Sequence, residues 1–327
     1  MNEDSLLDKN TVLSNVNLVL LFCIFIFYII YFPSRAFNNN FLFHQKKIKE
    51  SFEANDKNNV RNNEVNNNEN NDENISSEPL VDDDTYVKFY IKVFNQAEVY
   101  KSNVEKISRY IDTNSYIKIL DAGCGVGRHY ELLYKKFKQV IGIDKSNSFV
   151  KWAKIRNGNG LFIVDDFKNT NLFSSNKFSH ITCFLDTIYH NNIEDMKLIF
   201  KNFHYWLNND GMIFINIFLK DVLDPAPREF SQYYFDENKT KHSLTYFDNF
   251  THDAWWKING DNCFYNEQLI NKDGKSFLKI HKLTIPNEDT MVKYITNTGF
   301  EIVDMLKYND VDLNDMIMLI CRKKNNQ

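Results

Sequence analysis

A cluster of glycines constrains this chain more than any other feature of its sequence. Gly123, Gly125 and Gly127 fall within five residues, although the 327 residues include only ten glycines. They follow a strand-like run, Ile117–Leu120, and precede a helix-like stretch at 129–137. Glycine lets the backbone turn sharply and approach a ligand closely, and the start of the next helix presents free N–H groups. The sequence therefore predicts a ligand-binding loop between a strand and a helix.

The spacing of the glycines distinguishes between two classes of cofactor. The dinucleotide fingerprint GxGxxG needs a third glycine three residues after the second. Counted from Gly123 that position is Arg128, and counted from Gly125 it is Tyr130. The GxGxG spacing, with Asp121 just ahead of it, therefore disfavours an NAD-linked oxidoreductase.

Strand-like and helix-like stretches alternate from residue 85 onward. Apolar residues recur at helical spacing between Tyr86 and Tyr100. Strands are expected at 116–120, 140–143, 161–164, 180–185 and 212–218. Helices are expected between them at 130–137, 147–155 and 194–207. Alternation at this pitch predicts an α/β fold with a mostly parallel sheet covered by helices on both faces.

Acidic residues stand at the ends of the second and third expected strands. Asp144 follows Asp121 by about twenty residues, where a carboxylate can accept both hydroxyl hydrogens of a ribose. Asp165 and Asp166 end the next strand, where a carboxylate can bind an adenine amino group with Phe167 against the ring. Each acid alone would be read as a helix cap or turn residue, but together they favour cofactor binding.

The stretch from Tyr116 to Gly211 resembles the class I, Rossmann-like S-adenosylmethionine-dependent methyltransferases. LDAGCGVG at 120–127 is similar to their first motif, IGIDKS at 141–146 to the second and VDDF at 164–167 to the third. The expected fourth strand, the turn before the fifth, a helix near 289–298 and a last antiparallel strand at 316–321 also match the family's layout. The resemblance covers most of residues 85–327 and is weakest over 220–288.

The resemblance implies a seven-stranded sheet and S-adenosylmethionine as the cofactor. In this family the first acid and the glycines face the methionine end of the cofactor, and the second acid faces the ribose. The residues expected to bind the cofactor are Asp121, Gly123, Cys124, Gly125, Gly127, Asp144, Lys145, Asp165, Asp166 and Phe167. The five cysteines show no CxxC or Cys/His ligand spacing, so no metal site is expected.

Methyl transfer asks little of catalytic side chains. It is an in-line displacement at an electrophilic sulfonium carbon, so the protein mainly supplies proximity, alignment and desolvation. Asp186, Tyr189 and His190 follow the fourth strand, where the acceptor is expected to meet the methyl group. His190 is a candidate general base for a protonated acceptor, although it could equally be a loop histidine held by a neighbour.

Residues 220–288 are expected to form a lid over the acceptor. Phe264–Ile270 and Phe277–Ile285 flank Asp273-Gly274, which is a hairpin pattern. His281 and Tyr265 are candidate lining residues of the acceptor pocket. The sequence does not distinguish them from aromatic residues that only pack the lid against the sheet.

Two features of nucleic-acid methyltransferases are missing from this sequence, and their absence bears on which molecule accepts the methyl group. The Asn/Asp-Pro-Pro-aromatic tetrapeptide is replaced by Asp186–Tyr189 after the fourth strand, and no basic patch is evident at a net charge of −4. Nucleic acid is therefore disfavoured. A small-molecule or membrane-proximal acceptor is expected, and a protein acceptor stays open.

The N-terminal part of the chain has a different character. Val16–Phe32 is almost wholly apolar and about 25 Å long as a helix, which is close to a ~30 Å hydrocarbon core. Acids precede this run and basic residues follow it from Arg35, which predicts a single transmembrane helix with the later residues in the cytosol. A cleaved leader or a buried core helix are the alternatives.

The chain is thus divided into four parts. Residues 1–15 are a tail, 16–32 the transmembrane anchor, 33–84 an Asn-rich linker too poor in hydrophobic residues to fold, and 85–327 the methyltransferase domain. The leading prediction is a membrane-anchored methyltransferase. A catalytically silent, methyltransferase-like interaction module is the alternative, and the intact acids at the strand ends argue against it.

Overall fold

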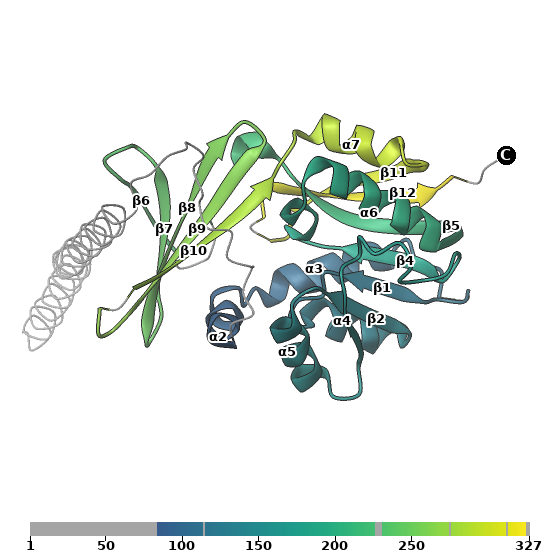
Figure 1. Cartoon of the computed structure of the whole chain (residues 1–327), viewed down its shortest axis with the longest axis horizontal. Helices are drawn as coiled ribbons and strands as arrows, with labels where there is room; N and C mark the ends of the chain where they lie inside the picture. The colour runs from purple at the N-terminus through teal and green to yellow at the C-terminus, as the bar shows by residue number, and fades with distance from the viewer. Residues whose placement is uncertain (1–83, 114, 226–230, 275, 312, 325–327) are drawn as a thin grey trace, which may run out of the picture. The chain divides into compact units, whose positions relative to one another are not determined.

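The computed structural model describes residues 84–113, 115–225, 231–274, 276–311 and 313–324 (Figure 1). The predicted tail, the predicted anchor at 16–32 and all but the last residue of the predicted linker lie outside this part of the chain. None of the helices in the described ranges is long and apolar enough to span a membrane.

A seven-stranded sheet forms the centre of the described structure, and its order is β11-β12-β5-β4-β1-β2-β3. Six of its strands run parallel, and β12 is antiparallel to both of its neighbours. The strands are β1 Ile119–Ala122, β2 Val140–Asp144, β3 Leu161–Val164, β4 Phe178–Cys183, β5 Leu207–Phe218, β11 Phe300–Lys307 and β12 Met316–Lys323. The predicted mostly parallel, Rossmann-like sheet is therefore confirmed.

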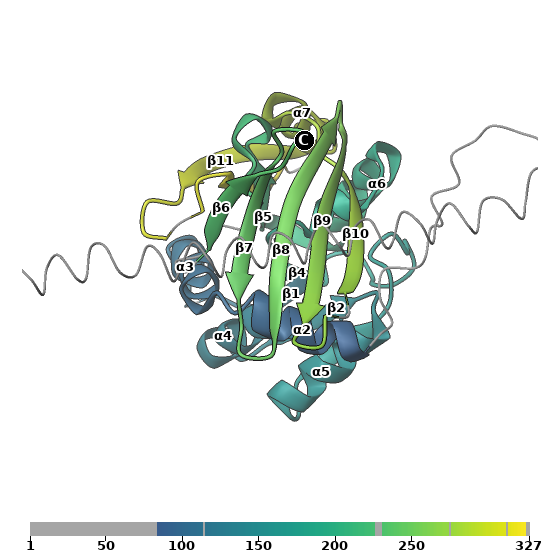
Figure 2. The same cartoon turned by 90° about the vertical axis from the view of Figure 1, so that its left-hand side faces the viewer.

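Helices cover both faces of this sheet. In Figure 2, α3 and α4 lie to one side of β1, β4 and β5, and α6 lies to the other. The helices are α2 Asp84–Val93, α3 Ala97–Ser108, α4 Arg128–Phe137, α5 Asn147–Asn157, α6 Ile193–Trp206 and α7 Glu288–Thr296. Side chains of Ser146, Asn192 and Asn287 cap the N-termini of α5, α6 and α7 by accepting a backbone N–H.

The helical pattern at 86–100 forms two helices rather than one. The guanidinium of Arg128, in α4, donates hydrogen bonds to the carbonyls of Ile91 and Phe94 at the end of α2. These contacts satisfy carbonyls that a continuing helix would use, so the chain turns before α3. The predicted linker is also one residue too long, because Asp84 lies in α2 and forms an ion pair with Lys151.

A second, five-stranded antiparallel sheet follows β5 and the short 3₁₀ helix η2 Lys220–Val222; we call it the lid sheet. Its strands are β6 Gln232–Phe235, β7 Lys241–Tyr246, β8 Phe250–Asn259, β9 Asn262–Asn271 and β10 Ser276–Thr284. The hairpin predicted around Asp273-Gly274 is the β9–β10 pair. The sequence did not predict β6, β7 and β8, which make the lid a sheet rather than a single hairpin.

Candidate active site

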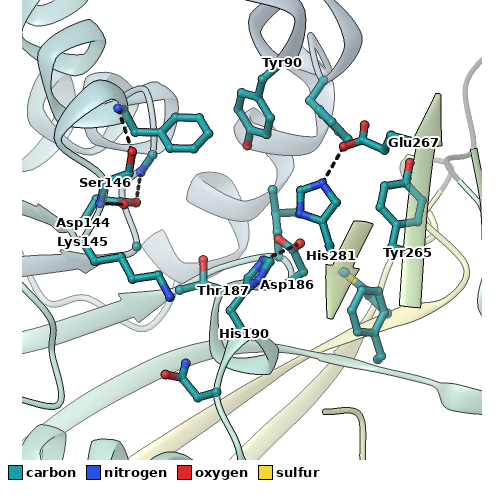
Figure 3. Close-up of a pocket in the computed structure, with 18 of the residues that line it drawn as sticks. Tyr90, Asp144, Lys145, Ser146, Asp186, Thr187, His190, Tyr265, Glu267 and His281 are labelled. Atoms are coloured by element: carbon teal, nitrogen blue, oxygen red, sulfur yellow. Dashed lines mark hydrogen bonds and ion pairs between the residues drawn. The ribbon is translucent and has the colours of Figure 1, made fainter. Parts of the chain in front are cut away.

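A pocket lies at the carboxyl ends of the parallel strands, which is where open α/β sheets bind ligands (Figure 3). Its wall is built from the glycine loop and the ends of β2, β3 and β4, from helix α2, and from strands β8, β9 and β10 of the lid sheet. One end of the pocket is thus formed by the central sheet, and the other by the lid sheet.

The structure shows why glycine, rather than a larger residue, occupies each of the three positions in the loop. All three have positive φ, between +51° and +76°. A side chain at Gly123 would overlap Thr187, and one at Gly127 would lie 2.5 Å from the Asn157 amide nitrogen. A Cβ on Gly125 would meet no protein atom within 4 Å, and Gly125 lines the pocket. The loop therefore needs Gly123 and Gly127 for packing, and Gly125 keeps the pocket open.

Asp144 fixes the loop to the end of β2. Its carboxylate accepts the N–H of Gly125 and the N–H of Ser146, each at 2.9 Å. Burial raises the pKa of the Asp144 carboxyl above its usual value. The side chain lines the pocket together with Lys145, and each carboxylate oxygen keeps a second lone pair for a ligand hydroxyl.

Asp121 lies in β1 and is almost fully buried without forming part of the pocket wall. Its Oδ1 accepts the hydroxyl of Thr182 at 2.8 Å, whereas its Oδ2 has no hydrogen-bond partner. Burial raises the pKa of this carboxyl to about 7. A buried acceptor without a donor is costly, and this carboxyl lies behind the glycine loop rather than in the pocket wall, so it can favour a cationic ligand group at the loop through its charge but not by direct contact.

The two acids after β3 occupy different places. Asp166 and Phe167 line the pocket, and Asp166 forms an ion pair of 3.6 Å with Lys168. Asp165 does not line it; its carboxylate accepts the backbone N–H of Asp166 at 2.7 Å and so stabilises the turn. The structure thus separates two neighbouring acids that the sequence could not.

Cys124 and Gly127 are also expected cofactor residues that do not line the pocket. The Cys124 side chain is buried against the backbone of Gly142, and burial raises the pKa of its thiol well above the usual value. The Cys124 N–H donates to the carbonyl of Ile143 at 3.0 Å. The structure gives both residues a place in shaping the loop.

The three residues predicted after β4 are split by the short 3₁₀ helix η1, Thr187–His190. Asp186 and His190 line the pocket, with 3.2 Å between Asp186 Oδ2 and His190 Nε2. Tyr189 points the other way: its side chain is fully buried, and its hydroxyl accepts the N–H of Phe218 at 2.8 Å. Tyr189 therefore packs the end of β5 and does not face the pocket.

His281 and Tyr265, the candidate lining residues of the lid, do line the pocket. Glu267, which no sequence pattern indicated, lines the pocket beside them. Its carboxylate accepts the Tyr86 hydroxyl at 2.6 Å and lies 2.7 Å from His281 Nε2 and 2.9 Å from His252 Nε2. Burial alone would raise the pKa of Glu267, but the two histidines outweigh it and hold the pKa well below its usual range.

The only signals that could have revealed this wall are weak. Tyr265 and Glu267 are two residues apart on β9, so they share a face, and His281 of the neighbouring strand β10 pairs with Tyr265. Tyr86 comes from α2, and only the fold shows that this helix reaches the lid sheet. A contact of such long sequence separation leaves no local pattern in the chain.

Known proteins similar to this chain are methyltransferases. A family model described as "Methyltransferase domain" matches residues 119–211. Phosphoethanolamine N-methyltransferase 1 of Arabidopsis thaliana is 28% identical over 173 residues, which cover 50% of this chain and 34% of that protein. The chain thus spans about a third of the length of this relative.

Two solved structures share the fold. An S-adenosylmethionine-dependent methyltransferase from Clostridium acetobutylicum is 21% identical, with a TM-score of 0.56 over 74% of this chain and 98% of that one. CalS10, an amino pentose methyltransferase from Micromonospora echinaspora solved with S-adenosylmethionine bound, is 16% identical, with a TM-score of 0.56 over 76% and 99%. Residues 119–211 therefore match the methyltransferase-domain family, and the described structure has the class I, Rossmann-like fold of S-adenosylmethionine-dependent methyltransferases.

Proposed function

We propose that this protein binds S-adenosylmethionine along the glycine loop and transfers its methyl group to a small molecule held under the lid sheet. The observation that carries the proposal is the pocket itself. It runs from Gly125 and Asp144 at the central sheet to Glu267 and His281 at the lid sheet, so it can hold a cofactor and an acceptor end to end.

The residues present fit the cofactor. All four residues expected at the nucleoside part line the pocket, so Gly125 would leave room for the cofactor, Asp144 would bind the ribose hydroxyls, and Asp166 with Phe167 would bind the adenine. The charge of Asp121, which lies behind the glycine loop, favours the cationic amino group at the methionine end without contacting it. When bound, the cofactor supplies an electrophilic methyl carbon on a sulfonium.

The chain's own part in the reaction is alignment and exclusion of water. The rings of Tyr90, Phe218 and Trp256, from α2, β5 and β8, line the pocket and remove water from around the reacting groups. A drier pocket strengthens the interactions of the charged groups in it, and a fixed acceptor needs no further ordering to react.

A small molecule is the better supported acceptor. Two of the three similar proteins named above are a phosphoethanolamine N-methyltransferase and an amino pentose methyltransferase, which by their names act on small molecules. The pocket is covered by the lid sheet and α2, which suits a small acceptor more than a polymer. We further propose that residues 16–32 anchor the protein to a membrane, with the methyltransferase domain in the cytosol.

Methyl transfer can be measured without knowing the acceptor. Full-length protein is incubated with S-adenosylmethionine carrying a labelled methyl group and with separate small-molecule, lipid and macromolecular fractions of a lysate. We expect label in the small-molecule or lipid fraction, and little with the Asp144→Ala variant. Label only in the macromolecular fraction would overturn the acceptor class, and no label in any fraction would overturn the activity.

A further inference from the structure

We infer that the acceptor is an amine that enters the pocket as an ammonium ion, and that His281 removes its proton before methyl transfer. This inference rests on the proposed function and concerns the half of the pocket covered by the lid sheet.

The charges lining the pocket favour a cation. Lys145, at the cofactor end, is the sole lysine or arginine among the described residues that line it. Six carboxylates line the same pocket: Asp144, Asp166, Asp186, Asp224, Glu267 and Asp315. Lysines outside the lining pair with two of them, Lys168 with Asp166 and Lys241 with Asp224, which leaves four carboxylates against one lysine. An anionic acceptor would meet this excess of negative charge, whereas an ammonium ion would be attracted by it.

Aromatic rings surround the acidic groups near the lid sheet. The ring centroids of Trp256 and Tyr265 are 5.0 Å apart, and His281 lies 5.9 Å from Tyr265 and 6.0 Å from Tyr86. Aromatic faces attract cations through their quadrupole, and aromatic cages are a common way to bind ammonium groups. Carboxylates and rings together therefore point to an amine more than to a hydroxyl or carboxylate acceptor.

His281 is held in the orientation that a general base needs. Its Nε2 lies 2.7 Å from Glu267 Oε2, so Nε2 carries the hydrogen and Nδ1 keeps the lone pair. Glu267 is itself fixed by the hydroxyl of Tyr86 and by His252, as described above. A carboxylate that fixes the tautomer and orientation of a histidine is the arrangement found in catalytic triads. Glu267 is then a positioning residue, since it acts through His281.

His190 is less suited to this role, although it faces His281 across the pocket. The two ring centroids are 6.0 Å apart, and Figure 3 shows His281 between Glu267 and the Asp186–His190 pair. His190 Nε2 is engaged by Asp186, and its Nδ1 is buried without a partner. Neither nitrogen of His190 is accessible to the substrate that accepts the methyl group. The contact of His190 with Asp186 instead fixes the orientation of the Asp186 carboxylate.

The reaction balances with His281 as the proton acceptor. The nitrogen's lone pair forms the new N–C bond while the S–C bond breaks and its electron pair stays on sulfur. An ammonium has no lone pair, so its proton first moves to His281 Nδ1 and from there to solvent. The charged and titratable groups that face His281 are Tyr86, Asp186, His190, Tyr265 and Glu267.

The first test identifies the methylated atom. Labelled products of the full-length protein and a small-molecule extract are analysed by mass spectrometry, and we expect the methyl group on nitrogen. Methylation of oxygen, carbon or sulfur would overturn the amine and leave the proposed methyltransferase intact. A complete lack of product, in contrast, would count against the proposed function itself.

The second test uses the amine found in this way and concerns the proton. We expect His281→Gln to lower kcat/KM at least 100-fold near pH 7, since general bases contribute about 10²–10⁴-fold. The loss should shrink as the pH is raised to values at which the free amine is unprotonated in solution. Glu267→Gln should act in the same direction, and the affinity for S-adenosylmethionine should stay within about twofold in both variants.

A second histidine variant serves as the control for the loss expected in His281→Gln. His204→Gln changes a histidine of α6 that packs against Phe300, away from the pocket, and should leave the pH profile unchanged. A loss in His281→Gln that is the same at every pH, or no loss at all, would overturn the role of His281. Unchanged cofactor affinity in that variant would show that the result is not caused by misfolding.

Discussion

The carboxyl of Asp121 links the binding site to stability at the scale of a single residue. Its pKa of about 7 in the folded protein lies above the value of an unfolded chain, because the side chain is buried. A raised carboxyl pKa contributes stability that is complete below about pH 4 and is lost as the pH rises through 7. The ligand-free protein should therefore become less stable between these two values.

Replacing this acid with a neutral group of the same shape should remove that pH dependence. We expect Asp121→Asn to be more stable than the wild type at pH 8 by up to about 4 kcal/mol, and by much less at pH 5. Urea unfolding of the ligand-free proteins at both values measures the difference. The exposed Asp248→Asn serves as the control, and equal differences at pH 5 and pH 8 would contradict the buried ionisation.

The neighbouring acids after β3 should differ in their effect on cofactor binding. Asp166 lines the pocket, so Asp166→Ala should weaken S-adenosylmethionine binding about tenfold or more through loss of a buried hydrogen bond. Asp165→Ala should have a smaller effect, because its carboxylate only stabilises the turn. Calorimetry on the two variants decides the point, and the opposite ranking would mean that the adenine binds elsewhere.

The residues that the sequence could place are those at the ends of regular elements. Asp144 and Asp166 lie on the pocket wall because parallel strands end at one edge of the sheet, and that is readable from the chain. The direction of a side chain inside a turn cannot be read from the chain. For this reason Tyr189 and Asp165 were predicted to face the site together with their sequence neighbours, although neither lines the pocket. Glu267 was missed, although Tyr265 and His281 beside it were named, because the sequence does not show that a single carboxylate in a strand is buried.

At the scale of elements, two glycines of the same loop have different roles: Gly127 is needed for stability and Gly125 for cofactor binding. Gly127→Ala should lower stability, because the residue has a φ of +76° and its Cβ would approach Asn157. Gly125→Ala should cost less stability, about 1 kcal/mol from its positive φ, but should reduce cofactor affinity more. Thermal unfolding and cofactor titration of both variants test this, and a Gly125→Ala variant with full affinity would contradict it.

Elements with a largely apolar pattern were predicted well, and the polar strands of the lid sheet were not. In the central sheet, β1, β2 and the second half of β5 are mostly apolar and largely buried, as parallel strands covered on both faces should be. Strands β7 and β8 instead carry buried polar residues, among them Ser243, His252 and Asp253. The break between α2 and α3 depends on Arg128, a contact distant in sequence that no local propensity encodes.

At the scale of the whole molecule, the pocket exists only because distant segments meet. Helix α2 lies before the glycine loop and β10 lies about 160 residues after it, yet both line the same wall. The sequence could indicate the cofactor end, which comes from consecutive strand ends. The acceptor end depends on how α2 and the lid sheet come together, and therefore needed the structure.

The N-terminal apolar run carries a prediction of its own. If residues 16–32 are a membrane anchor, the full-length protein should sediment with membranes, and deletion of residues 1–34 should make it soluble. Alkaline extraction followed by ultracentrifugation measures both proteins. A full-length protein that stays in the supernatant would rule the anchor out.

The most direct test of the whole account is the calorimetric titration of the full-length protein with S-adenosylmethionine and with its demethylated product. We expect both to bind, and we expect Asp144→Ala to weaken the binding by about 2 kcal/mol, or roughly 30-fold, while Asp248→Asn does not. Absence of binding for both ligands would contradict the proposal that this pocket holds the cofactor.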